Sequence, residues 1–155
     1  MSDDIGLTFE GLPQFDAAMQ ELAGPGFDRA SRKALRAGGR IIQEAITEAA
    51  PVRTPLPSGD ALPPGALKSD IELHVAKEGD GSFAAYIEPG KYTIRVARWV
   101  EEGHAEKRGK KVTGRVEAHP FFRRAFESSV DQAEATALET FNEKIAEEAA
   151  KVGLG

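Results

Sequence analysis

A proline-rich segment near the middle of the chain limits the folds that are open to it. Residues 51–66, PVRTPLPSGDALPPGA, contain five prolines and two glycines. Proline lacks a backbone N–H and fixes φ, so neither a helix nor a central strand can run through this segment. We therefore expect an extended loop here. A loop of this length in a small domain is typically functional or mobile.

The chain before this loop has mainly helical periodicity. Alternating apolar residues predict a short strand over residues 5–9, and spacings of three and four predict a short amphipathic helix over residues 12–22. A longer helix is predicted over residues 27–50, where Pro51 ends it. Gly38 and Gly39 lie inside this helix and indicate either a close approach by another element or a bend. Its apolar positions are Leu35, Ile42, Ile46 and Ala49.

After the loop, the pattern changes to that of a hairpin followed by a helix. LKSDIELHVAKE predicts a strand through Ile71, Leu73 and Val75, and FAAYIE predicts a second strand. GDGS at 79–82 is a turn signal between them. In IRVARWVEEG the period is helical again, with Gly103 as the expected cap. The apolar set of that helix is Val96, Trp99 and Val100.

The last third of the chain joins a basic segment to a long helical pattern. Residues 106–117 are predicted to form a basic loop or an extended hairpin arm, because they contain almost nothing to bury. Residues 120–152 are predicted to form a long helix. Its apolar positions are Phe122, Phe126, Val130, Leu138, Phe141, Ile145 and Ala149.

Together these elements predict an α+β fold in one domain spanning residues 1–155. A small antiparallel sheet is expected to pack against the long helix of the N-terminal half and the long C-terminal helix. The composition, with 41% hydrophobic and 29% charged residues, is typical of a soluble globular protein. No internal repeat is found.

Composition also excludes several classes of function. The chain has no cysteine, which removes disulfides, thiolate metal sites and cysteine nucleophiles. The acidic start MSDDIGLTFEGL is unlike a secretory signal, and no apolar run approaches the roughly 20 residues that span a bilayer. We therefore expect no membrane association. A net charge of -5 argues against nucleic-acid binding over the whole surface, although local basic patches remain candidates.

The sequence carries little sign of catalysis. The three histidines, His74, His104 and His119, lack the spacing of a helical zinc pair, and HExxH, serine-hydrolase and phosphate-loop motifs are absent. A composite site of Glu101, His104 and His119 is the one arrangement that stays open. Structural or surface roles are the expected reading of these residues. We expect no enzymatic activity and no cofactor or metal.

Two basic features are candidates for contacts. Helical spacing places five cations on one face of the helix over 27–50, either as a solvated face or as a contact for phosphates or an acidic surface, such as another subunit's C-terminal helix. The C-terminal helix is correspondingly rich in acids. A second cluster lies in 106–117, where it could touch DNA or form a mobile loop. The two sets are Arg29, Arg32, Lys33, Arg36 and Arg40, and Lys107, Arg108, Lys110, Lys111 and Arg115.

Four segments, in order, resemble those of the lambdoid-phage tail-component family, also described as minor tail protein Z-like. They are GLPQFDAAMQEL, ALRAGGRIIQEAITEAAPVRT, ARWVEEGH and AHPFFRRAFE, and they run from about Gly11 to Glu127. The third is similar to the family's aromatic-x-Glu-x-Gly segment and the fourth to its Ala-x-Pro-Phe-Leu-Arg-Pro-Ala block. The chain departs from the family in the inserted PLPSGDALPP, in Ala125 after Arg124 and in its longer basic arm.

The resemblance implies a structural virion protein at the head-tail junction. Such a neck or tail-completion protein is made in the host cytoplasm and forms a hexameric or dodecameric ring around the DNA channel. The ring joins the head-closure and portal proteins to the tail terminator or tail tube. In this reading Phe121 and Phe122 serve the core and a neighbour at once. The candidate contacts are Arg29, Arg32, Lys33, Arg36, Arg40, Trp99, His119, Pro120, Phe121 and Phe122.

Three other functions remain as alternatives. The chain could be a tail terminator that caps the tail tube, or a nucleic-acid-binding module that uses the helix face and the basic segment. In the second case, binding should weaken steeply with salt. A hydrolase or metal enzyme centred on His104 and His119 is the third.

Overall fold

The computed structural model describes residues 7–10, 24–52 and 62–151, the first range as backbone alone. The predicted α+β class is confirmed, because long helices and antiparallel strands alternate along the chain. The predicted helix over 12–22, residues 53–61 of the loop and the end of the predicted C-terminal helix at Val152 lie outside the described residues. The elements are β1 (Leu7–Glu10), α2 (Pro25–Ala49), α3 (Ala66–Ser69), β2 (Ile71–Lys77), β3 (Phe83–Pro89), α4 (Ile94–Glu102), β4 (His104–Arg108), β5 (Lys111–Val116) and α5 (Phe121–Lys151).

The main sheet has three antiparallel strands, with β3 between β1 and β2. β2 and β3 form the predicted hairpin, in which Leu73 lies opposite Ile87 and Val75 opposite Ala85. Its turn is closed by Glu78 N–H, which donates to the Ser82 carbonyl at 2.8 Å. Because strand side chains alternate between faces, these paired apolar residues share one face, where they join the core or pack against it.

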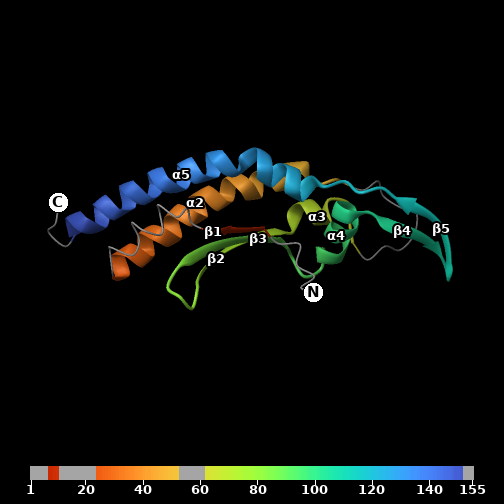
Figure 1. Ribbon diagram of the computed structural model, residues 1–155, viewed down its shortest axis with the longest axis horizontal. Helices are drawn as coiled ribbons and strands as arrows, with labels where there is room; N and C mark the ends of the chain where they lie inside the picture. Colours follow the sequence, from red (N-terminus) through yellow and green to blue (C-terminus); the bar gives the residue numbers. More distant parts are fainter. Residues whose placement is uncertain (1–6, 11–23, 53–61, 152–155) are drawn as a thin grey trace.

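Both long helices lie on the same side of this sheet (Figure 1). α2 packs against β2 and β3, and α5 packs along α2. Phe27 of α2 contacts both the main sheet and α5. Its ring centroid lies 6.4 Å from that of Phe83 in β3 and 5.7 Å from that of Phe141 in α5. The core is therefore shared by the sheet and the helix pair rather than enclosed by either.

The glycine pair in α2 allows close approach on two sides. A Cβ at Gly38 would lie 2.6 Å from the carbonyl oxygen of Ala133 and 3.0 Å from Cβ of Ala137, both in α5. A Cβ at Gly39 would lie 2.7 Å from Leu73 Cδ1 of β2. Of the two predicted roles for this pair, close approach by neighbouring elements is the one observed.

Small residues also determine which side of α5 is buried. The helix has the predicted position and length, but Leu138, predicted to be apolar core, is 41% exposed. The buried positions in this part of α5 are Ala133, Ala137 and Phe141. Alanines face α2 because only short side chains fit where the two backbones nearly touch. Similarly, at the end of α2 Ala49 is exposed and Ala50 is buried.

Three residues fix where the chain leaves the main sheet and enters α4. The Asp70 carbonyl accepts from Gly90 N–H at 2.7 Å, and its carboxylate accepts from Thr93 Oγ1 at 2.8 Å. The Asp70 carboxylate fills the space that a Cβ at Gly90 would occupy. The start of β2 thereby holds the end of β3 and the first turn of α4 together.

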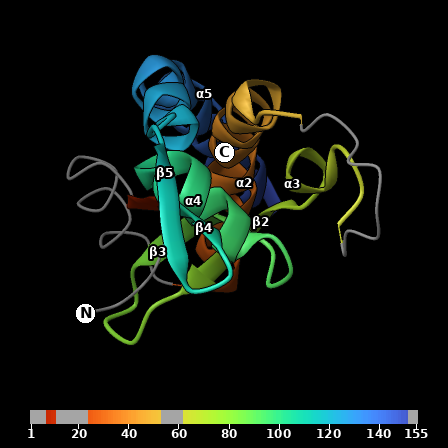
Figure 2. The ribbon, with the colours of Figure 1, turned by 90° about the vertical axis from the view of Figure 1, so that its right-hand side faces the viewer.

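α4 and a second, two-stranded sheet occupy one end of an elongated molecule (Figure 1). Figure 2 looks onto this end, with β4 and β5 in front of the helix pair. In the described ranges, no helix combines the length and the apolar character that crossing a membrane requires.

Candidate functional site

The basic segment forms the second sheet, an antiparallel hairpin of β4 and β5. Of the two predicted forms, loop or hairpin arm, the hairpin is the one observed. Both strands are exposed along their length, apart from the half-buried His104 at the root. Two apolar side chains on β5 are also in solvent, Val112 at 58% and Val116 at 43% exposure. The exposed cations are Lys107, Arg108, Lys110, Lys111 and Arg115.

The hairpin begins where the chain leaves α4 through Gly103. This residue has φ +73°, and a Cβ on it would lie 2.6 Å from the Val116 carbonyl oxygen and 2.8 Å from Ala118 N. Both the backbone conformation and the space therefore require glycine. The predicted cap at Gly103 is confirmed, and the same residue sets how closely the two ends of the hairpin meet.

Glu101 connects α4 to the start of α5. Its carboxylate accepts hydrogen bonds from Phe122 N–H at 2.9 Å and from Arg123 N–H at 3.1 Å. These are backbone donors of the first turn of α5, which has no internal partner for them. The sequence suggested either a solvated helix end or a composite metal site for Glu101. Its capping role was missed, because the capped helix begins about 20 residues later in the chain.

The His-Pro-Phe-Phe segment, residues 119–122, is a second connection between α4 and the start of α5. His119 N–H donates to the Val100 carbonyl at 2.7 Å, so the segment is tied to α4. Phe121 and Phe122 are only 1% and 2% exposed, with ring centroids 5.8 Å apart in an edge-to-face contact. The prediction that one of these rings faces a neighbour is corrected here: both belong to this chain's own core. The His119 side chain remains exposed and Pro120 is half-buried.

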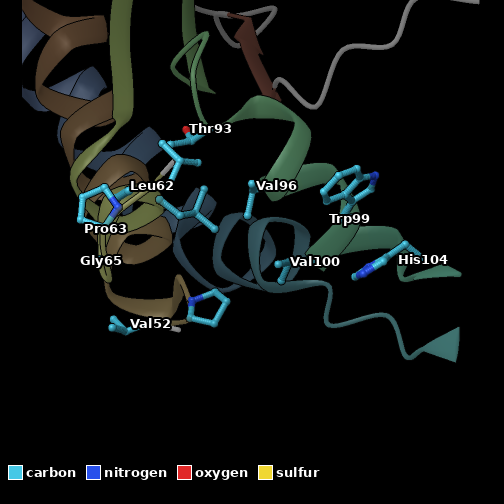
Figure 3. Close-up of a pocket in the computed structure, with 12 residues that line it drawn as sticks. Val52, Leu62, Pro63, Gly65, Thr93, Val96, Trp99, Val100 and His104 are labelled. Carbon is cyan, nitrogen blue, oxygen red and sulfur yellow. The ribbon is translucent and has the colours of Figure 1, made fainter. Parts of the chain in front are cut away.

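An apolar cavity of about 410 Å³ opens beside α4 (Figure 3). Figure 3 shows Val96 in the middle, Leu62 and Pro63 on one side, and Trp99 and His104 on the other. Trp99 is 45% exposed and stacks on His104 at 5.4 Å between ring centroids. The structure thus joins the end of the proline-rich loop to the helix face that was predicted to be apolar. The lining residues are Pro51, Val52, Leu62, Pro63, Gly65, Ala66, Leu67, Thr93, Val96, Trp99, Val100 and His104.

The cationic face of α2 is partly used within the chain. Arg29 pairs with Glu148 of α5 at 2.5 Å. The hydrogen bond from Arg29, followed by one from Lys151, lowers the pKa of Glu148 from 4.5 to about 2. Arg32 donates to the Val75 carbonyl at 3.4 Å and lies over the Phe83 ring.

The rest of this face has fewer contacts. The charge of Lys33 contributes to the lowered pKa of Glu147, after the larger effect of the hydrogen bond from Lys144. Arg36 and Arg40 are exposed and have no ion pair with another described residue. Opposite charges of the two long helices thus pair inside the chain at one end of the helix pair, through Arg29 and Glu148.

The three histidines do not converge on a site. His74 stacks on Tyr86 of the main sheet at 5.0 Å and lies 3.6 Å from Glu88. His104 faces the cavity, and its Nδ1 is buried without a hydrogen-bond partner among the described residues. Within the described ranges, no three His, Asp or Glu residues are grouped so that they could hold a metal ion.

Comparison with known proteins gives one match. A family model described as "Bacteriophage HK97-gp10, putative tail-component" matches residues 14–103. The match runs through α2, the β2–β3 hairpin and α4, and ends at Gly103 before the basic hairpin. No curated protein and no solved structure shows significant similarity to the chain.

Proposed function

The chain belongs to the HK97-gp10-like family of bacteriophage tail components, and from this we propose that it is a structural protein of the phage head-tail junction. In this role several copies form a ring around the DNA channel. The ring joins head-closure proteins on one side to the tail terminator or tail tube on the other. The resemblance of the four sequence segments and the family match support the same placement.

The β4–β5 hairpin is the observation that carries this proposal. A two-stranded ribbon with both faces in solvent is marginally stable by itself. Here it also exposes two valines and five cations at one end of an elongated molecule. A chain gains little from such an element alone, whereas contact with another protein would cover it.

The cavity beside α4 supports the same reading. Aromatic residues with exposed apolar surface are enriched in protein interfaces. Trp99 lines the cavity, and its helix α4 lies at the same end of the molecule as the hairpin. An incoming segment of a head or tail protein could therefore contact both features. We further propose that the chain acts by assembly and has no catalytic role.

Loss of the protein in an infected cell tests the proposed function. Phage that carry a nonsense mutation in this gene should make DNA-filled heads and tails of normal length that stay separate under the electron microscope. Supplying the wild-type chain in extracts should join them. The joined particles should contain the chain at a fixed number of copies per particle. Joined, infectious particles without the chain would contradict the proposal.

Two further observations separate the alternatives. Tails of uncontrolled length in the mutant would indicate a terminator instead. Replacing His104 and His119 together by alanine should leave head-tail joining unchanged. Loss of joining in this variant with normal assembly of the ring would favour a chemical role for the histidines.

A nucleic-acid-binding module is the second candidate, favoured by the five exposed cations on an extended ribbon. If each cation met one phosphate of duplex DNA, log K would fall with log salt with a slope of about -4 to -5. Filter binding to duplex DNA between low and physiological salt measures this slope. A slope near zero would remove this candidate.

A further inference from the structure

Exposed acidic residues form a row along α5 that makes no ion pair among the described residues. Glu127, Asp131, Glu139 and Glu143 are separated by multiples of four residues, so they form a row that winds around the helix by about 40° for every four residues, and all four are exposed. We call these four residues the acidic ridge. Residues 127–143 contain no Lys or Arg at all.

This arrangement disfavours the isolated chain. Like charges four residues apart on a helix repel, by roughly 0.2–0.5 kcal/mol per pair. In the part of the chain that the structure describes, no member of the ridge makes an ion pair. The acids near the end of α5 differ, because Glu147 and Glu148 are paired with Lys144 and Arg29. A cationic partner along the ridge would remove the repulsion.

The β4–β5 hairpin has the complementary charge. It carries five cations and one acid, Glu106, and none of the cations pairs with an acid among the described residues. Alternate residues of a strand are about 6.6 Å apart, and residues four apart on a helix are about 6 Å apart. On β5, Lys111 and Arg115 lie about 13 Å apart, and Asp131 and Glu139 are about 12 Å apart along α5, so a strand laid along the ridge could bring two cations near two carboxylates.

Exposed apolar residues match in the same place. Val112, 58% exposed, follows Lys110 and Lys111 in the hairpin, and Leu138, 41% exposed, lies two turns after Asp131 on nearly the same side of α5. The phosphates of DNA provide no apolar contact for a side chain such as Val112. The combination of valine and cations on the hairpin thus suits an acidic protein surface that carries an apolar residue better than it suits DNA.

Within one copy the two surfaces cannot meet, because the hairpin extends away from α5 at the end where that helix begins (Figure 1). A contact between two copies would be head-to-tail, since different patches are used on each. Repeated contacts of this kind form a ring when the rotation closes.

We propose that the β4–β5 hairpin of one copy docks along the acidic ridge of α5 in the next copy. The partner is thus a second copy of this chain, held by ion pairs around a contact between Val112 and Leu138. This inference rests on the proposed ring, and it assigns the ring's subunit contact to two defined surfaces.

Charge reversal with rescue tests the pairing. Lys110→Glu/Lys111→Glu and Glu139→Lys/Glu143→Lys are each expected to raise the protein concentration for half-assembly by about tenfold or more. Combining the four substitutions should restore most of the loss. Assembly is measured by mass photometry of the purified chain, alone and with isolated heads, and by head-tail joining in extracts.

One pair on α2 serves as a matched control, and a second pair tests an alternative contact. Glu44→Lys/Glu48→Lys reverses exposed charges at the same helical spacing and should assemble normally, whereas Arg36→Glu/Arg40→Glu reverses two candidate contacts on α2. Circular dichroism melting of every variant verifies folding. An effect of the arginine pair as large as that of the hairpin pair would move the contact to α2 and overturn the proposal.

Crosslinking gives an independent readout, because the chain has no cysteine of its own. A chain with Lys110→Cys and Glu139→Cys should form a disulfide ladder in assembled particles, whose highest band reports the copy number. Lys110→Cys with Glu44→Cys should form no ladder beyond a dimer. Absence of the ladder in joined particles would overturn the proposal.

The proposed function and the proposed contact can fail separately. If the nonsense mutant leaves heads and tails unjoined but the reversed charges have no effect, the junction role stands and this contact is wrong. If the hairpin reversal abolishes joining and the ridge reversal does not, the hairpin binds another surface or DNA. Joined particles without the chain remove the junction role itself.

Discussion

At the scale of single residues, Gly38 is the position where α2 and α5 come closest. Gly38→Ala would place a Cβ 2.6 Å from a carbonyl oxygen of α5. We expect a loss of about 1–3 kcal/mol in the free energy of unfolding, reduced by up to about 1 kcal/mol through the better helix propensity of alanine. Denaturant unfolding followed by circular dichroism measures the change.

Gly39→Ala is the matched control for this substitution. The added Cβ meets the end of the Leu73 side chain, which can rotate away, rather than a backbone atom. Gly39→Ala should therefore lower the free energy of unfolding clearly less than Gly38→Ala does. Equal costs would mean that the helix pair separates more easily than the structure indicates.

Glu101 gives a second residue-scale prediction. Glu101→Ala removes the acceptor for two backbone N–H groups of α5 and should destabilise the protein by about 1 kcal/mol. Glu102→Ala removes only an exposed pair with Arg98 and should cost little. Similar unfolding midpoints for both variants would contradict the capping role.

Residue roles of this kind are where sequence reasoning was weakest. The pair Gly38 and Gly39 predicted a close approach or a bend, but the identity of the neighbours depends on tertiary contacts. Glu101 gave no local signal, because it caps a helix that follows the whole hairpin. Phe121 and Phe122 were predicted to be divided between core and neighbour, and both are buried because they belong to the core cluster that α5 shares with α2, the main sheet and α4.

At the scale of elements, periodicity predicted the described helices and strands well. α2, the β2–β3 hairpin, α4 and α5 lie where 3.6-residue and two-residue periods predicted them. The single turn α3 was not predicted. The sequence did not decide between a loop and a hairpin for the basic segment, because strands exposed on both faces have no apolar alternation to detect. The inner face of α5 was partly misassigned because alanine carries a weak hydrophobic signal.

The two hairpins should differ in their hydrogen exchange. β2–β3 packs against α2, whereas β4–β5 has exposed faces. We therefore expect the amides of β4–β5 to exchange much faster than those of β2–β3 in the monomer, and to become protected in the assembled particle. Mass-spectrometric exchange on both forms measures this. Strong protection of β4–β5 in the monomer would show that the ribbon is stable without a partner.

At the scale of the whole molecule, one ion pair joins the start of α2 to the end of α5. Because the pKa of Glu148 falls from 4.5 to about 2, its stabilising effect is complete above pH 4.5 and is lost as the pH falls towards 2. Glu148→Gln should therefore lower stability at neutral pH and flatten the decline over that acid range.

Unfolding midpoints measured from neutral to acid pH test this prediction. Glu139→Gln, which removes an exposed acid of the ridge, is the control. Its unfolding midpoint should fall with decreasing pH as steeply as that of the wild type. If the midpoint of Glu148→Gln also falls as steeply, the pair with Arg29 does not contribute to acid stability.

The functional class was predictable at this scale only through resemblance, which the family match then confirmed. Composition and missing motifs argued against catalysis, but no rule of periodicity leads to a phage tail component. The position of the candidate site was partly predictable, since Trp99 and the basic cluster were identified. Their common location at one end of the molecule was not, because it depends on how Asp70, Gly90 and Gly103 direct the chain.

The uneven charge of the molecule also has a kinetic consequence. The hairpin at one end of the molecule is strongly positive. Because the whole chain has a net charge of -5, the rest of the molecule is strongly negative. Such a molecule has a large electric dipole moment. Near a charged surface it is rotated before it touches, so its approach is already oriented, and this steering weakens as added salt shortens the reach of the field.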